Sequence, residues 1–295
     1  MAGSDTLKDW LTWSFSPTAS AIAVTLLVSL LLPVLIHFYL YRKAASAVLP
    51  AFLLIGPSGA GKTTLLTLFS SGTLLPTQTS QEPQSVQCQL LSEVSTSDDQ
   101  YRSVNDTSSR TQPKFLLIDT PGHGKLRQHA TTSLTSTPAL KGLLFVVDSA
   151  AISSAAGLTE TAEYLYDVLL MLQKRHTLSK TTKEPQSIPV LILANKQDVF
   201  TSLPLTMVQK KLEDEITKIR LTRSKGVLDS GIGMDGEDAD DEEQHWLGEF
   251  DSKHFTLAQM EEHGIEVAVL AGSVKGENGK AGNTQDWWVW IGQQL

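Results

Sequence analysis

Short runs of consecutive apolar residues recur along the chain after residue 50, separated by stretches with apolar residues at helical spacing. Continuous apolar runs of this length are typical of strands buried on both faces, as in a parallel sheet covered by helices. The predicted strands are residues 51–55, 86–91, 115–118, 142–147, 189–193 and 267–270, and the weakly alternating second one suits a sheet edge. The predicted helices are residues 62–69, 160–174 and 205–221. This order predicts an α/β fold with a mostly parallel central sheet.

A longer apolar run, residues 19–41, contains no Lys, Arg, Asp or Glu. A helix of this length crosses a hydrocarbon core of about 30 Å. A cleaved signal peptide would have a basic segment and a shorter apolar core, and a buried core helix would have a polar face, so we predict a transmembrane helix. Arg42 and Lys43 follow the run directly and mark its cytoplasmic side. The expected organisation is a lumenal N-terminus (1–18), a span (19–41), a linker (42–50) and a cytosolic domain (51–295).

Composition and charge narrow the class of function. With 24 Lys+Arg against 32 Asp+Glu, the net charge of −8 argues against nucleic acid as the main partner. The single cysteine, Cys88, excludes an internal disulfide framework. Residues 229–251 hold ten of the acidic residues and no Lys or Arg, so the acidity belongs to one segment. We interpret it as part of a flexible insertion at 224–253, with an acidic contact site for a basic partner as the alternative. A second flexible loop is expected at 95–112.

The most specific motif is G-P-S-G-A-G-K-T at residues 56–63, between the first predicted strand and the first predicted helix of the cytosolic part. It matches the phosphate-binding loop G-x-x-x-x-G-K-[ST] in the context that this loop requires. Its glycines let backbone N–H groups approach a phosphate, and the helix N-terminus favours an anion. Lys62 is expected to reach the β- and γ-phosphates and the Thr63 hydroxyl to bind Mg²⁺. The predicted nucleotide-binding residues here are Gly56, Ser58, Gly59, Ala60, Gly61, Lys62, Thr63 and Thr64.

A second motif, N-K-Q-D at residues 195–198, follows the predicted strand 189–193 and selects the base. The Asp198 carboxylate can accept hydrogen bonds from both N1–H and the N2 amino group of guanine, a pair of donors that adenine does not offer. Asn195 can bridge the base region to the phosphate-binding loop, and the Lys196 stem can lie over the purine face. An ATP-binding transporter subunit would need an L-S-G-G-Q signature, which the sequence does not contain. The motif therefore favours a guanine nucleotide.

A third motif, D-T-P-G-H at residues 119–123, follows the predicted strand 115–118. Asp119 is expected to support Mg²⁺ through its water shell, and the Gly122 N–H to sense the γ-phosphate. His123 stands where Ras-like proteins place a glutamine that orients the attacking water. A structural histidine that caps a loop is the alternative for His123.

Two further elements complete the pattern. Thr77 and Thr79 are candidates for the threonine that completes the Mg²⁺ shell, and Thr79 is favoured because T-S-Q-E resembles the switch of Sar-type GTPases. After the last predicted strand, G-S-V-K-G at 272–276 resembles the S-A-K loop that approaches the guanine O6 through backbone N–H groups. The residues predicted to act there are Ser273, Val274 and Lys275.

These elements, in this order between residues 55 and 276, resemble a Ras-like P-loop GTPase of the Arf/Sar branch. With a preceding span, they are similar to the beta-subunit family of the signal recognition particle receptor. The resemblance implies bound GTP and Mg²⁺, an endoplasmic-reticulum membrane location and a receptor alpha subunit as partner, with the ribosome or translocon as further candidates. The protein would then tether the alpha subunit in a GTP-dependent manner for co-translational protein targeting. An Arf/Sar-like GTPase of membrane traffic and an ATP-driven enzyme are the alternatives.

We also hypothesise slow intrinsic GTP hydrolysis, because no arginine finger is evident in the chain. The protein would then act mainly as a nucleotide-dependent binding switch rather than as an enzyme of high turnover.

Overall fold

The computed structural model describes residues 19–45, 49–94, 112–137, 139–179, 187–230, 246–248, 252–276 and 280–295. The chain divides into two units, Met1–Val48 and Leu49–Leu295, which we describe separately. Nearly all of the loop expected at 95–112 lies outside the described residues, as do 231–245 and 249–251 of the acidic segment. Their predicted flexibility therefore stays a prediction.

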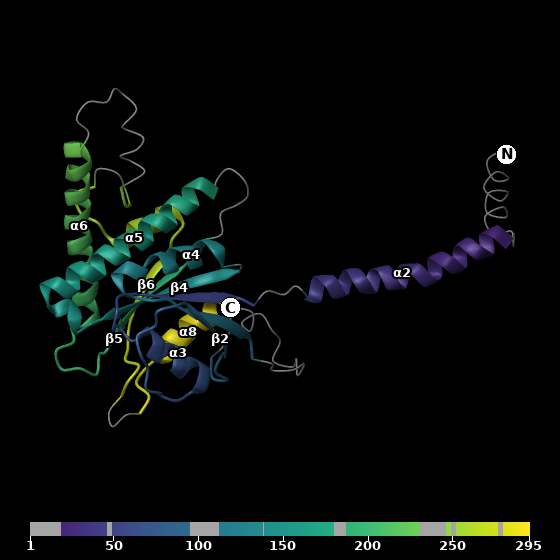
Figure 1. Ribbon diagram of the computed structural model, residues 1–295, viewed down its shortest axis with the longest axis horizontal. Coiled ribbons are helices and arrows are strands. Elements are labelled where there is room, and N and C mark those ends of the chain that lie inside the picture. The colour runs from purple at the N-terminus through teal and green to yellow at the C-terminus, as the bar shows by residue number, and fades with distance from the viewer. Residues whose placement is uncertain are drawn as a thin grey trace, which may run out of the picture. The chain divides into compact units, whose positions relative to one another are not determined.

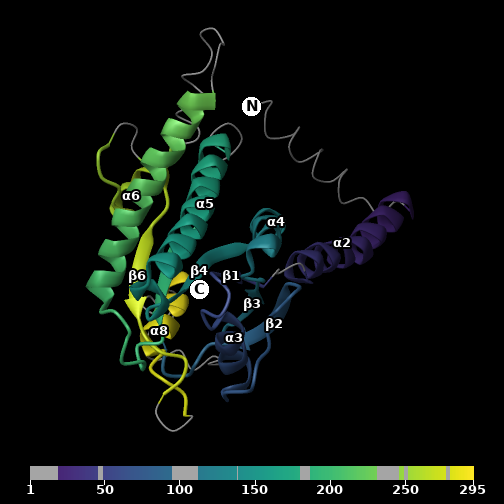
Figure 2. The same ribbon diagram turned by 60° about the vertical axis from the view of Figure 1, so that its left-hand side comes forward.

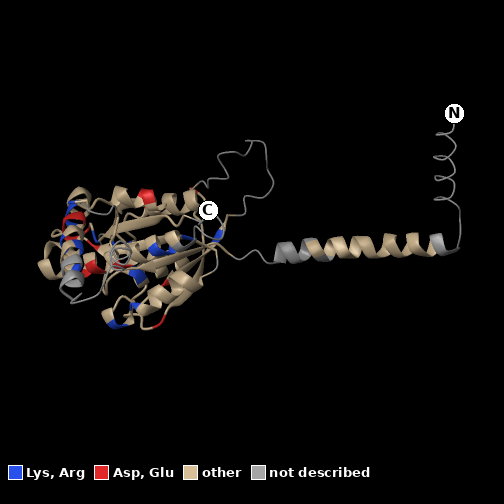
Figure 3. Cartoon of the chain, turned by 90° about the horizontal axis from the view of Figure 1, so that it is seen from above, with Lys and Arg blue, Asp and Glu red and all other residues tan. Residues whose placement is uncertain are grey.

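The described part of the first unit is helix α2 (Ala19–Ala45), which contains Pro33 (Figure 1). Its side chains are described without interruption over residues 22–37, and Figure 3 shows no charged residue along this stretch. Within the described residues, no helix combines the length and the apolar character that crossing a membrane needs. The transmembrane helix expected over 19–41 is thus not confirmed by the structure.

The second unit is built on a six-stranded sheet of order β2-β3-β1-β4-β5-β6. β2 pairs antiparallel with β3, and every other neighbouring pair is parallel. The mostly parallel sheet and the edge position of β2 are therefore confirmed. The strands are β1 (Ala51–Ile55), β2 (Gln84–Gln89), β3 (Lys114–Asp119), β4 (Leu140–Asp148), β5 (Val190–Asn195) and β6 (Val267–Ala271).

Strand β1 is apolar throughout because both of its faces are covered. In β1, Phe52 and Leu54 belong to the core on one face of the sheet. Ala51, Leu53 and Ile55 belong to the core on the other face. A strand with one face in water would alternate with polar residues, so the continuous run AFLLI reflects the two-sided burial.

Helices cover both faces of the sheet (Figures 1 and 2). One core contains residues of α4 (Gln128–Ser136), α5 (Ala155–Ser179) and α6 (Leu205–Ser230), and the other contains residues of α3 (Lys62–Ser71) and α8 (Gln285–Gln294). α6 runs to Ser230, so it passes residue 221, where the apolar pattern predicted its end, and includes the start of the segment expected to be flexible at 224–253. Neither α4 nor α8 was predicted.

The described residues near the end of the acidic segment, 246–248, are fixed to α5 and α6. The Gln173 amide donates to the Trp246 carbonyl at 3.0 Å and accepts from the Gly248 N–H at 2.9 Å. Arg220, whose side chain is fully buried, donates to the Leu247 carbonyl at 3.1 Å. Because buried polar groups need partners, these bonds determine where the chain rejoins the domain before η4 (Leu257–His263) and β6.

Candidate nucleotide-binding site

The loop between β1 and α3 has a backbone that only glycine adopts readily. Gly56, Gly59 and Gly61 have φ angles of 147°, 76° and 101°. A Cβ on Gly56 would lie 2.2 Å from the Val146 carbonyl oxygen, and one on Gly61 would lie 2.5 Å from Asn195 Nδ2. At Gly56 and Gly61 the loop therefore has neither the backbone nor the space for a side chain. It leads into the N-terminus of α3, which favours an anion.

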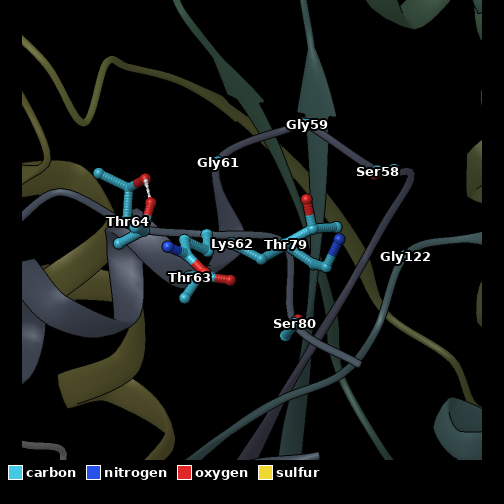
Figure 4. A pocket seen from close by; sticks show the side chains of 11 residues that line it. Ser58, Gly59, Gly61, Lys62, Thr63, Thr64, Thr79, Ser80 and Gly122 are labelled. Carbon is cyan, nitrogen blue, oxygen red and sulfur yellow. Dashed lines mark hydrogen bonds between the residues drawn. The ribbon is translucent and has the colours of Figure 1, made fainter. Parts of the chain in front are cut away.

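A cavity of about 200 Å³ opens at this loop (Figure 4). Its walls come from the loop itself, the first turn of α3, residues 77–80 and Gly122. Gly56 and Ala60, predicted with the loop, are buried and do not line the cavity. The lining residues are Ser58, Gly59, Gly61, Lys62, Thr63, Thr64, Thr77, Gln78, Thr79, Ser80 and Gly122.

Lys62 is 5% exposed and lies beside Thr63 in the cavity (Figure 4). Its ammonium group donates to the carbonyl oxygens of Gly56 at 2.8 Å and Pro57 at 2.9 Å. Burial lowers the pKa of Lys62 to about 8, although the nearby Asp119 carboxylate acts in the opposite direction. The lysine is thus held at the cavity by the loop that precedes it.

Thr63 and Asp119 offer oxygen ligands to a metal ion. The Thr63 hydroxyl donates to Asp119 Oδ2 at 2.6 Å. Asp119 is fully buried, and its Oδ1 has no hydrogen-bond partner among the described residues. Burial raises the pKa of Asp119, while Thr63 and Lys62 act in the opposite direction. Since Mg²⁺ prefers oxygen ligands, this arrangement fits an ion held by Thr63 and Asp119.

Both candidate switch threonines line the cavity. The Thr77 and Thr64 hydroxyls share a hydrogen bond of 3.0 Å, drawn as a dashed line at Thr64 in Figure 4. Thr79 lies next to Lys62 and Thr63 in the same view. Because the Thr77 hydroxyl already has a partner, the geometry favours Thr79 as the additional Mg²⁺ ligand, and this assignment stays a prediction.

A second cluster forms where β5 and β6 end. Asn195 is 2% exposed, and its Nδ2 donates to the Ala60 carbonyl at 2.7 Å. Its Oδ1 accepts from the N–H groups of Lys196 at 2.8 Å and Val274 at 3.0 Å. The expected bridge from Asn195 to the phosphate-binding loop is therefore present. Asp198 is exposed, and no described residue bonds to its carboxylate, which leaves it open to a base.

In the loop after β6, two of the backbone N–H groups expected to approach the guanine O6 are bonded elsewhere. The Val274 N–H donates to Asn195, and the Ser273 N–H donates to the Asn283 carbonyl at 3.0 Å. Both donors are thus committed within the protein and do not face a purine oxygen. Of the three predicted residues, Lys275 retains a backbone N–H without a partner among the described residues.

His123 does not line the cavity. Its side chain is exposed, and Nδ1 accepts from the Lys125 N–H at 3.3 Å at the start of η2 (Gly124–Leu126). This contact is the capping role that the sequence left as an alternative, and a catalytic role stays a prediction. Gly122, directly before it, lies against the phosphate-binding loop, since a Cβ there would be 2.4 Å from Lys62 Nζ.

Sequence reasoning missed a group at the end of β4. Asp148 lies opposite Asn195 in the parallel register, and its Oδ2 accepts from Lys196 Nζ at 2.6 Å. The Gln197 side chain donates to Ser149 Oγ at 2.9 Å. A signal was available, because polar residues directly after a buried parallel strand lie at the same sheet edge as the other site residues.

The sheet order, the phosphate-binding loop and the polar groups at the carboxyl ends of β1, β3 and β5 define a P-loop GTPase fold of the Ras-like class. Residues 47–264 match the family described as signal recognition particle receptor beta subunit. The human beta subunit is 30% identical over 97% of this chain and 90% of its own length. The Saccharomyces cerevisiae subunit is 30% identical over 83% of this chain and 84% of its own length. The chain therefore belongs to the signal recognition particle receptor beta subunit family.

Solved structures agree with this assignment. The SRb-GTP/SRX complex from Chaetomium thermophilum matches with a TM-score of 0.65 and 38% identity, over 82% of this chain and 99% of that chain. The SRb-GDP-Mg structure from the same organism has a TM-score of 0.58 and 38% identity, over 84% of this chain and 98% of that chain. Membership of the receptor family does not favour the alternative of an Arf/Sar-like GTPase in membrane traffic.

Proposed function

We propose that the protein is the GTP-binding subunit that tethers the receptor alpha subunit at the endoplasmic-reticulum membrane for co-translational protein targeting. Its family supports the membrane location and the alpha subunit as partner. The proposal of a guanine nucleotide rests mainly on the hydrogen bond from Asn195 to the Ala60 carbonyl, which joins the base motif to the phosphate-binding loop. Asp198, in the same motif, is exposed. A guanine nucleotide could then contact both parts of the site at once.

Different side chains of the chain contact the phosphates, the base and the metal ion in this proposal. The Lys62 ammonium faces the phosphates, and the Asp198 carboxylate accepts from the two guanine donors. Thr63 and Thr79 would hold the metal ion, and Asp119 would support it through its water shell. When bound, Mg²⁺ neutralises phosphate charge. Related structures from Chaetomium thermophilum are of SRb-GTP, SRb-GDP and SRb-GDP-Mg, which supports this ligand set.

A partner could read the nucleotide through two segments at the cavity. Residues 77–80 and Gly122 line the same space as Lys62. Contacts to the γ-phosphate and the metal ion would favour one arrangement of both segments, and a partner that binds this arrangement is controlled by the nucleotide. We therefore place the GTP-dependent contact with the alpha subunit on these segments.

We also propose slow intrinsic hydrolysis and a binding switch as the main activity. No arginine is among the described residues that line the cavity, and His123 lies outside the lining. A cationic group near the developing charge, or a group that orients water, accounts for much of the rate in fast GTPases. Rapid GTP turnover by the purified full-length protein without any partner would contradict this proposal.

The test uses the full-length protein from detergent-solubilised membranes. We expect GTP to copurify with it and the alpha subunit to be captured in the GTP-loaded state. The matched variant is Asp198→Asn, which should lose GTP and bind xanthosine triphosphate instead, so that xanthosine triphosphate restores capture of the alpha subunit. Equal competition by ATP, or equal capture of the alpha subunit whatever the nucleotide, would overturn the proposal.

The proposed topology places residues 1–18 in the lumen, 19–41 in the membrane and the GTPase domain in the cytosol. An N-glycosylation site introduced within residues 1–18 should be modified in microsomes. External protease should degrade the GTPase domain in the same preparation. Protection of that domain with an unmodified site would show the opposite orientation, and degradation of the domain with an unmodified site would show that the N-terminus does not cross the membrane.

A further inference from the structure

We propose that Asp148 is a positioning residue for the guanine base and acts by fixing the Lys196 side chain along the base site. This inference rests on the proposed binding of a guanine nucleotide. None of the sequence motifs includes Asp148. The evidence is its place at the end of β4, opposite Asn195 in the register, and the ion pair with Lys196.

The Asp148 carboxylate is itself held in one orientation. Its Oδ1 accepts from the N–H groups of Ala150 and Ala151, both at 3.0 Å. Its Oδ2 accepts from Lys196 Nζ at 2.6 Å. A rotation of the carboxylate about its Cα–Cβ bond would break all three hydrogen bonds, so the group offers the lysine a fixed acceptor.

Lys196 is held at both of its ends. Its φ angle of 65° is in the left-handed region, which few residues other than glycine adopt. Its backbone N–H donates to Asn195 Oδ1 at 2.8 Å, and its ammonium group is bonded to Asp148. The methylene stem therefore runs along the sheet edge between Asn195 and Asp148. A stem fixed in this way offers an apolar surface to one face of a purine.

The residue after Lys196 shows that the rest of this segment is already rigid. The Gln197 N–H donates to the Gly272 carbonyl at 3.2 Å, and its side chain donates to Ser149 Oγ at 2.9 Å and the Leu203 carbonyl at 3.0 Å. The freedom that remains at this position is that of the long Lys196 side chain. Pairing with Asp148 removes that freedom before the nucleotide arrives, and preorganisation of this kind favours the bound state.

The effect should be moderate because water reaches the pair. The Lys196 side chain is 35% exposed and that of Asp148 is 17% exposed. Solvent and salt screen such an ion pair, so its main contribution is orientation rather than attraction. We therefore expect a change in the rate of nucleotide release, and not a loss of binding.

The experiment measures release of a fluorescent GTP analogue from the full-length protein. Asp148→Asn keeps an oxygen that accepts from Ala150 and Ala151 but removes the charge. Lys196→Met keeps the length of the stem but removes the ammonium group. Each single variant should release the analogue about three- to tenfold faster than the wild type, the range expected for contacting residues. The double variant should release it no faster than Lys196→Met alone, because Asp148 acts through Lys196.

A control separates this role from a general loss of an ion pair. Asp167→Asn removes a similar pair, in which Arg223 donates to Asp167 at 2.7 Å between α6 and α5. This variant should release the analogue at the wild-type rate. The melting temperature of nucleotide-free Asp148→Asn should also equal that of the wild type, since both backbone N–H groups keep their acceptor.

The possible results lead to different conclusions. Wild-type release from Asp148→Asn, in a protein that retains GTP, would overturn the inference and leave the proposed function standing. Effects of Asp148→Asn and Lys196→Met that multiply in the double variant would also overturn it, because Asp148 would then act independently of Lys196. Faster release from Asp167→Asn would do the same. A wild-type protein that retains no GTP would refute the proposed function, and the inference with it.

Discussion

Replacing Asn195 with alanine should both destabilise the domain and remove its affinity for guanine nucleotide. The Asn195 side chain makes three hydrogen bonds of 2.7–3.0 Å that join the phosphate-binding loop, β5 and the loop after β6. It is 2% exposed, so water does not replace these bonds when the side chain is removed. The Ala60 carbonyl and the Val274 N–H would lose their partner in the interior.

The magnitude follows from these contacts. A hydrogen bond between neutral groups contributes about 0.5–1.5 kcal/mol, and a buried group left without a partner costs about 1–3 kcal/mol. Some relaxation of the two loops offsets this cost, so we expect a loss of about 2–4 kcal/mol in the free energy of unfolding. For a domain of this size, that corresponds to a decrease of about 4–16 °C in the melting temperature.

The assay is thermal unfolding of the full-length protein in detergent, with and without GTP and Mg²⁺. The matched control is Asp198→Ala, because Asp198 is exposed and no described residue bonds to it. Without nucleotide, this control should melt at the wild-type temperature. Its melting temperature should rise little when GTP is added. The Asn195→Ala variant should melt early in both conditions.

Two results would refute this reasoning. If nucleotide-free Asn195→Ala melts within about 1 °C of the wild type, its three bonds do not hold the loops together. If nucleotide-free Asp198→Ala melts as early as Asn195→Ala, Asp198 also stabilises the fold, and the proposed distinction between a structural bridge at Asn195 and a base contact at Asp198 is wrong.

Three further predictions concern the phosphate end of the site. Gly122→Ala should weaken GTP binding at least about tenfold, because its Cβ would lie 2.4 Å from Lys62 Nζ. The control Gly124→Ala has open space at its Cβ and should bind GTP like the wild type in the same titration. The pKa of Lys62 is about 8 and phosphate favours its charged form, so GTP binding above pH 8 takes up a proton. Calorimetry should therefore show affinity that is level below about pH 7.5 and falls as the pH rises above about 8, and a flat profile would contradict this. Thr79→Ala should raise the Mg²⁺ concentration needed to retain GTP, whereas Thr77→Ala should not, and the reverse result would assign the switch to Thr77.

Much of the sheet could be predicted because strands such as β1, β4 and β5 are buried on both faces and contain long apolar runs. The prediction for β1 agrees with the observed bounds, and β6 extends one residue beyond its prediction. The helices α4 and α8 were missed for opposite reasons. The sequence QHATTSLTS of α4 buries only Ala130 and Leu134, too few to show a helical period. The sequence QDWWVWIGQQ of α8 is rich in aromatic residues, which are common in strands, and its helical form depends on packing such as Trp288 against Phe69.

The site was predictable as far as motifs and strand ends determine it. The spacing of the motifs located the phosphate-binding loop and the bridge made by Asn195. The hydrogen-bond partners of the loop residues could not be predicted. Val274 donates to Asn195 because segments distant in sequence meet in space. His123 instead accepts from Lys125 only two residues away, a local contact that the motif does not indicate. Asp148 was missed because it belongs to no motif, although it ends a strand at the same edge.

The bridge made by Asn195 also affects when the protein can first bind its nucleotide during synthesis. Its partners Ala60 and Val274 lie 135 residues before it and 79 residues after it along the chain. The phosphate-binding loop leaves the ribosome early, but Val274 lies far behind it along the chain and emerges much later. Contacts between such distant residues form late, since the whole intervening chain must first be ordered. A chain that stops before the loop after β6 would therefore fail to retain GTP, and nucleotide binding would report that both partners of Asn195 are in place.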